Sequence, residues 1–236
     1  MRSLISGLIL GTIIGSSPVV SETLPLPQSL IALNSDAGEQ LLLDADARAD
    51  YFDLGIHLTH QVHPAFCGPA SMAMVLNALN VPRPASPMTL GLGLFDQENV
   101  FTPATEAVKP RARIERAGLT LDELGGMFEA HTVTASVHHA EDSSLDEFRT
   151  IAVESLNDDD SFILVNYRRA DMGQEKGGHI SPLGAYDAET DRFLILDVTS
   201  YKYPPVWVEA ATLFGAMNTP DSDNDDRSRG YLVVAR

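Results

Sequence analysis

A single cysteine stands in the 236-residue sequence, at a position suited to nucleophilic chemistry. Cys67 lies in the stretch QVHPAFCGPASMAMVLNAL, residues 61–79, directly before Gly-Pro-Ala and a run with helical spacing. A helix N-terminus carries partial positive charge and free N–H groups, and both stabilise a thiolate. Because the thiolate is the nucleophilic form of cysteine, this placement predicts a reactive thiol; the alternative is a buried, inert cysteine.

A thiol nucleophile also needs donors for the oxyanion that forms during acyl transfer. Gln61 lies six residues before Cys67, a spacing characteristic of papain-like cysteine enzymes. Its side-chain amide and the backbone N–H of Cys67 could together bind an oxyanion. We therefore interpret Gln61 as the oxyanion donor.

The base must be one of seven histidines. Three of them recur at every third position, a spacing that could indicate a metal clip: His57, His60 and His63. Pro64 and the loop-like context argue against a helix there, and no cysteine pattern supports zinc, so we predict no metal site. Three others lie in polar surroundings and are expected at the surface: His131, His138 and His139.

The remaining histidine, His179, follows two glycines in GGHISPLGAY and opens an apolar stretch. Glycines at such a place allow a substrate to approach the backbone closely. Asp197 ends the next apolar stretch, RFLILDV, and a turn at 187–191 would bring the two residues to the same end of a hairpin. We predict that Asp197 orients the His179 imidazole, although the pair alone also fits a core histidine beside a strand-end aspartate.

Helical and strand-like segments must position these residues. Apolar positions 72, 75, 76 and 79 repeat with helical spacing, and Pro69 suits the first turn of that helix. Further helices are expected over 38–49, over 103–130 with a break at Gly118, and over 144–156. Strands are expected over 161–168, 179–186, 192–198, 204–208 and 230–235. Helices followed by hairpin-connected strands predict an α+β fold, with the nucleophile helix packed on an antiparallel sheet.

The composition and net charge of the chain exclude some classes of binding partner. Hydrophobic residues make up 44% and charged residues 21%, which is ordinary for a globular protein, and the net charge is −17. Such a charge repels nucleic acid and anionic membrane surfaces, so neither is an expected partner.

Residues 1–21 differ from the rest, because Arg2 precedes an apolar run over 4–14 and then small residues. This pattern predicts a secretory signal peptide cleaved near Ser21, followed by one domain over 22–236. We expect a protein exported to the periplasm of a Gram-negative bacterium, without stable membrane association after cleavage. The alternative is an uncleaved N-terminal anchor.

Three strings carry a resemblance to a known family: CGPASMAMVLNAL, NYRRADMGQEKGGHISPLGAYDAETDRFLILDVTSYKYPPVWV and AMNTPDSDNDDRSRGYLVV. From about Asp53 to Arg236 the chain resembles the short, single-domain prokaryotic kind of phytochelatin synthase. That resemblance implies a papain-like fold and a γ-glutamylcysteine transferase acting on glutathione. It further implies a triad of Cys67, His179 and Asp197, with Gln61 as oxyanion donor.

By the same resemblance, the thiolate attacks the cysteinyl carbonyl of glutathione, glycine leaves, and a γ-glutamylcysteinyl thioester forms. Transfer to water gives γ-glutamylcysteine, and transfer to a second glutathione gives a phytochelatin. The short prokaryotic members are associated chiefly with hydrolysis and with only slow synthesis. We therefore expect mainly hydrolysis.

The resemblance also suggests substrate-binding residues. Arg169 and Lys202 correspond to basic residues near the site, and Gly178 lies directly before the base. Asp221 and Arg229 would face the α-amino and α-carboxylate groups of the γ-glutamyl moiety, since such a head group needs one anion and one bidentate cation.

No cofactor is expected for hydrolysis. A heavy metal ion such as cadmium would enter as a complex with glutathione thiolates, and with one cysteine we expect no metal sensing by a thiol cluster. A homodimer is an assembly that the sequence leaves open. Two rival interpretations are a papain-like peptidase and a non-catalytic exported protein that binds metal or thiols through Cys67.

Overall fold

The structure is a computed structural model that describes residues 23–83 and 92–236. The predicted signal peptide, residues 1–21, lies outside the described residues. Within the part described, no helix is both long enough and apolar enough to cross a membrane.

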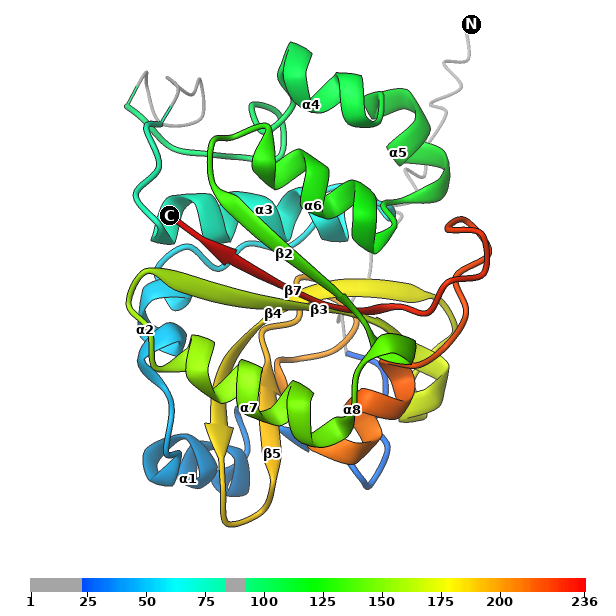
Figure 1. The fold of residues 1–236 in the computed structure, drawn as a ribbon. Coiled ribbons are helices and arrows are strands. Elements are labelled where there is room, and N and C mark those ends of the chain that lie inside the picture. Colours follow the sequence, from blue (N-terminus) through cyan, green and yellow to red (C-terminus); the bar gives the residue numbers. More distant parts are fainter. Residues whose placement is uncertain (1–22, 84–91) are drawn as a thin grey trace, which may run out of the picture.

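An antiparallel sheet forms the centre of the molecule (Figure 1). Among the described residues it has seven strands, in the order β1-β6-β5-β4-β3-β7-β2. Their bounds are Ile31–Ala32 (β1), Thr134–His139 (β2), Ser161–Arg168 (β3), Gly178–Asp187 (β4), Arg192–Ile195 (β5), Val206–Glu209 (β6) and Gly230–Ala235 (β7). Every pairing between neighbours is antiparallel. With the helices described next, this is the predicted α+β class.

Helices lie on both faces of the sheet. The α-helices are Asp36–Asp44 (α1), Ala49–Gly55 (α2), Cys67–Ala78 (α3), Pro103–Val108 (α4), Arg111–Ala117 (α5), Leu121–Glu129 (α6), Leu145–Leu156 (α7) and Ala210–Met217 (α8). Short 3-10 turns span Ala140–Asp142 and Arg169–Met172. Figure 1 shows α3 and α6 on one face, and α7 and α8 on the other.

Strand β3 shows why this sheet needs two covering layers. Phe162 and Leu164 belong to the core under α3 and α6, whereas Ile163 and Val165 belong to the core under α7 and α8. Successive side chains of a strand point to opposite faces, so a continuous apolar run must be buried on both sides. The run SFILVNYR satisfies that condition.

Most predicted elements are confirmed. Helix α3 begins at Cys67, and β4 and β5 form the predicted hairpin. Helix α6 starts with a capping box formed by Thr120 and Glu123. The helical region over 103–130 has a second break, at Pro110, in addition to the one at Gly118. Strands β1 and β2 and helices α2 and α8 lack clear sequence signals and were not expected.

The prediction that three histidines lie at the surface is wrong for His131 and His139, which are 9% and 4% exposed. His131 Nε2 lies 3.0 Å from the Val100 carbonyl oxygen, and His139 Nδ1 lies 2.5 Å from that of Ser228. Burial is tolerated because these ring nitrogens have partners. His138 is half-buried and stacks on the Tyr231 ring at 4.7 Å.

Candidate active site

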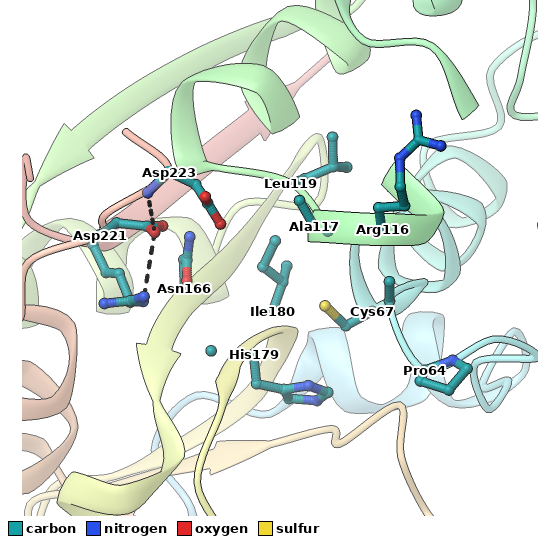
Figure 2. A pocket seen from close by; sticks show the side chains of 14 residues that line it. Pro64, Cys67, Arg116, Ala117, Leu119, Asn166, His179, Ile180, Asp221 and Asp223 are labelled. Atoms are coloured by element: carbon teal, nitrogen blue, oxygen red, sulfur yellow. Dashed lines mark hydrogen bonds and ion pairs between the residues drawn. The ribbon is translucent and has the colours of Figure 1, made fainter. Parts of the chain in front are cut away.

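Cys67 opens into a cavity of about 360 Å³ between α3, α5 and the sheet (Figure 2). Its lining comes from the start of α3, the end of α5, strands β3 and β4, and the loop before β7. The lining residues are Pro64, Ala65, Cys67, Arg116, Ala117, Gly118, Leu119, Asn166, Gly178, His179, Ile180, Asp221, Asp223 and Arg229.

The start of α3 places the thiol among backbone donors. Cys67 is the first helical residue and Pro69 the third, so proline removes an N–H that the first turn leaves unpaired. Gly68 allows close packing, because a Cβ there would lie 2.6 Å from Leu119 Cδ1. The thiol therefore lies at the positive N-terminal end of α3, and Leu119 packs against the first turn of that helix at Gly68.

Burial alone would raise the pKa of the Cys67 thiol, yet the net shift of the pKa is downward. A hydrogen bond with the His179 side chain and the charge of that imidazole outweigh burial, helped by backbone hydrogen bonds at Ile180 and Gly68. This environment favours a thiolate beside an imidazolium.

His179 lies near the start of β4, with its imidazole next to Cys67 (Figure 2). Its Nε2 is 3.0 Å from Asp197 Oδ1, which leaves Nδ1 as the nitrogen that faces the thiol. The Tyr167 ring packs edge-on against the imidazole at 5.7 Å. Burial lowers the pKa of His179, but the negative charge of Asp197 and the hydrogen bonds to Asp197 and Cys67 raise it overall.

Asp197 is fully buried two residues beyond the end of β5 and accepts several hydrogen bonds. Arg169 Nη2 donates to both carboxylate oxygens, at 2.9 and 2.8 Å, and the Thr199 backbone N–H and hydroxyl donate to Oδ1 at 2.8 and 2.6 Å. Burial would raise the pKa of Asp197, but the charge of His179 and these donors hold the pKa well below its usual range.

Arg169 therefore does not lie where a substrate-binding residue was expected. It is 5% exposed, it does not line the cavity, and its guanidinium also donates to Gln174 at 2.5 Å and packs over the rings of Tyr167 and Tyr203. The structure places it behind Asp197, where it supports that carboxylate and does not reach a ligand in the cavity.

The opposite end of the cavity combines an anion with donors. Arg229 Nη2 lies 3.3 Å from Asp221 Oδ1, while Arg229 Nε is buried without a hydrogen-bond partner in the described part of the chain. Asn166 Nδ2, on β3, is also buried and unpartnered there. A Cβ at Gly178 would be in van der Waals contact with Arg229 Nε, at 3.5 Å, so glycine leaves this donor uncovered on that side. A ligand with a carboxylate and an ammonium would satisfy these groups.

Sequence reasoning missed Asn166 as a lining residue. The signal that could have found it is a polar side chain inside the apolar run SFILVNYR, because such a residue needs partners when it is buried.

Gln61 and Lys202 lie outside the cavity lining. Gln61 is buried; its Nε2 donates to the His63 carbonyl at 2.9 Å, and its backbone N–H donates to Val198, next to Asp197. Lys202 is paired with Glu175 at 2.8 Å, with 42% of its side chain exposed. The structure thus brings Gln61 close to the Asp197 segment and leaves Lys202 at the surface.

Within residues 23–83 and 92–236, no group of three or more His, Cys, Asp or Glu side chains is arranged to hold a metal ion.

Comparisons with known proteins agree on one family. The family model for phytochelatin synthase matches residues 21–231. The chain is 32% identical over 216 residues to glutathione gamma-glutamylcysteinyltransferase 1 of Lotus japonicus, covering 90% of this chain and 42% of that protein. It is 28% identical over 212 residues to the glutathione gamma-glutamylcysteinyltransferase of Schizosaccharomyces pombe, covering 89% of this chain and 50% of that protein. The chain spans about half the length of these curated relatives or less. Because the family model matches residues 21–231, which is most of the chain, this chain belongs to the phytochelatin synthase family.

Proposed function

We propose that this protein is a glutathione γ-glutamylcysteinyltransferase that works through a γ-glutamylcysteinyl thioester on Cys67. The observation that carries the proposal is the placement of Cys67 next to His179, whose Nε2 lies 3.0 Å from Asp197 Oδ1. This series lies beside a cavity whose far end holds Asp221 and Arg229. The names of the matched relatives support glutathione as the substrate.

In the first half-reaction the Cys67 thiolate attacks the cysteinyl carbonyl carbon of glutathione, forming a C–S bond. The carbon–nitrogen bond to glycine then breaks, and His179 gives its proton to the departing amine. Asp197 keeps the imidazole in orientation and stabilises the imidazolium. Glycine leaves, and the acyl group remains on Cys67 as a thioester.

In the second half-reaction an acceptor attacks the thioester carbonyl carbon, and His179 takes the acceptor's proton. The C–S bond then breaks, and Cys67 leaves as the thiolate beside the imidazolium. Water as acceptor gives γ-glutamylcysteine, and the amine of a second glutathione gives a phytochelatin. We propose that hydrolysis dominates and that it needs no cofactor. A heavy metal ion such as cadmium would act as part of a glutathione thiolate complex, that is, as substrate.

Substrate orientation follows from the polar end of the cavity. Asp221 would bind the α-ammonium of the γ-glutamyl group, and Arg229 with the unpartnered amide of Asn166 would bind its α-carboxylate. Gly178 leaves room for these contacts.

The arrangement also supports a papain-like fold as part of the proposal, since the nucleophile begins a helix packed on the sheet that carries the histidine. Gln61 would supply an oxyanion donor if its amide, now bonded to His63, turns toward the cavity. We further propose a signal peptide over 1–21, one domain over 22–236, a periplasmic location and a homodimer as the assembly to test.

The decisive experiment incubates the protein lacking residues 1–21 with glutathione, with and without cadmium, and identifies the thiol products by mass. Cys67→Ser runs beside it as the matched control. Glycine with γ-glutamylcysteine or its oligomers, absent with the variant, would establish the activity and the acceptor. No product from wild type with its thiol free would reject the proposal, and cleavage of unrelated peptides would favour the peptidase.

A further inference from the structure

The cavity has a second end that neither the sequence nor the family comparison assigns. Asp221 and Asn166 lie to one side of Cys67 (Figure 2). Arg116 lines the cavity from a different side, at its rim, with its guanidinium directed away from the thiol. Ala117 and Gly118, which follow Arg116 in the chain, also line the cavity. A ligand that reacts at Cys67 therefore extends in two directions.

Arg116 is an exposed cation in the last turn of α5 and has no hydrogen bond or ion pair with any described residue. Arg111, at the start of the same helix, is held by Glu98 and Glu115. An unpaired guanidinium at the rim of a cavity is notable in a chain whose net charge is −17. It is available to an anionic ligand group.

The proposed substrate has an anionic group in that direction. Attack at the cysteinyl carbonyl leaves the γ-glutamyl group on one side of the reacting carbon and glycine on the other. With the γ-glutamyl head at Asp221 and Arg229, the glycine carboxylate lies toward Arg116, about one residue, or ~3.8 Å of chain, beyond the reacting bond. Guanidinium and carboxylate match in a bidentate geometry.

We infer that Arg116 is a specificity-determining residue that binds the free C-terminal carboxylate of the leaving residue. The inference rests on the proposed function. It means that the site selects a tripeptide with a free carboxyl end and disfavours substrates in which that carboxyl group is blocked.

The test compares glutathione with its C-terminal amide, which lacks the negative charge of the leaving residue. The parameter is kcat/KM for release of glycine or glycinamide, because it reports the steps up to the thioester whatever the acceptor. Arg116→Gln should lower kcat/KM for glutathione by about 10- to 100-fold, the usual effect of losing a charge-assisted hydrogen-bond pair. It should leave kcat/KM for the amide nearly unchanged.

Arg113→Gln is the matched control, because Arg113 is exposed on the same helix and does not line the cavity. It should leave both substrates unaffected. If Arg116→Gln lowers kcat/KM equally for glutathione and its amide, or lowers it for neither, the inference is overturned. The proposed function still stands in that case, provided that the wild-type protein releases glycine. Absence of glycine release by wild type would overturn the proposed function and, with it, this inference.

Discussion

Arg169 Nη2 lies 2.8 Å from Asp197 Oδ2, on the side of the carboxylate away from the cavity. Asp197 Oδ1 at the same time accepts from His179 Nε2 at 3.0 Å. One fully buried carboxylate thus balances a guanidinium and an imidazole. The ionic state of the imidazole depends on an arginine that does not reach the substrate.

Replacing Arg169 should destabilise the whole domain. Arg169→Met removes one of the two cationic partners of the buried Asp197, and breaking one side of a buried ion pair costs about 3–5 kcal/mol. We expect the free energy of unfolding in urea to fall by that order. Arg168→Gln is the control, because Arg168 pairs with Asp171 at the surface and its loss should be small. Equal effects of the two variants would contradict the buried role.

Asp197→Asn should shift the pH dependence of activity. Asp197 raises the pKa of His179, so its loss lowers that pKa and moves the alkaline limb of kcat/KM to lower pH. The acidic limb belongs to Cys67, whose pKa is already lowered. An unchanged alkaline limb would remove Asp197 from its proposed role.

His179→Ala should cost more turnover than Asp197→Asn. Loss of a general acid–base group lowers the rate by about 100- to 10,000-fold, whereas asparagine still offers an oxygen to His179 Nε2. Steady-state glycine release by the two variants, with their unfolding temperatures as a control for folding, measures the difference. Equal losses would leave the orienting role unsupported.

Cys67→Ser should abolish glycine release and leave the fold intact, because the change is nearly isosteric. Circular dichroism and the unfolding temperature should match wild type. Residual turnover above about 1% would argue against Cys67 as nucleophile, since a serine without thiolate character reacts far more slowly.

Substitutions of Arg229 and Lys202 should have different effects on KM for glutathione. Arg229→Lys removes the fork and its unpartnered Nε, so KM for glutathione should rise about tenfold or more. Lys202→Ala should leave KM unchanged, because Lys202 pairs with Glu175 at the surface. A raised KM in Lys202→Ala would restore the sequence-based expectation that this lysine binds substrate.

Asp50 should make stability depend on pH. It is 2% exposed, and burial, followed by the charges of Asp53, Asp158 and Asp159, raises its pKa to about 8. The folded state keeps this proton up to that pH, whereas the unfolded chain loses it near pH 4, so stability falls as pH rises from about 4 to 8. Each pKa unit corresponds to about 1.4 kcal/mol.

Asp50→Asn should therefore gain stability relative to wild type at pH 8 and little at pH 4, as measured by urea unfolding. Asp44→Asn, at the exposed end of α1, serves as the control and should change stability little at either pH. A gain from Asp50→Asn that does not change with pH would show that Asp50 is already ionised in the folded state.

The sequence predicted the parts of the fold that have strong local signals. Helix α3 has apolar periodicity and a proline in its first turn, and β3 to β5 have apolar runs with a polar turn. Strand β2, TASVHH, alternates weakly and is a strand because it pairs with β7, a partner almost a hundred residues away. His139, the last residue of β2, is buried for the same reason.

In the candidate site, the sequence spacing predicted that Cys67, His179 and Asp197 lie close together, and the structure places them so. This prediction was possible because each residue lies at or near the end of a predicted helix or strand. The positive charge shared by Arg169, Lys202 and Arg229 could not show which of them lines the cavity. Their positions behind the carboxylate, at the surface and at the cavity follow from tertiary packing. Arg116 is likewise recognisable only once α5 is placed beside Cys67.

Strand β7 lies between β3 and β2 in the interior of the sheet, and Arg229 directly precedes it. During synthesis, β2 and β3 emerge long before residues 230–235, and each has an open edge until those residues insert between them. The same insertion delivers Arg229 to the cavity. A nascent chain that already contains Cys67, His179 and Asp197 therefore still lacks part of the cavity lining. The insertion of β7 completes both the sheet and that lining.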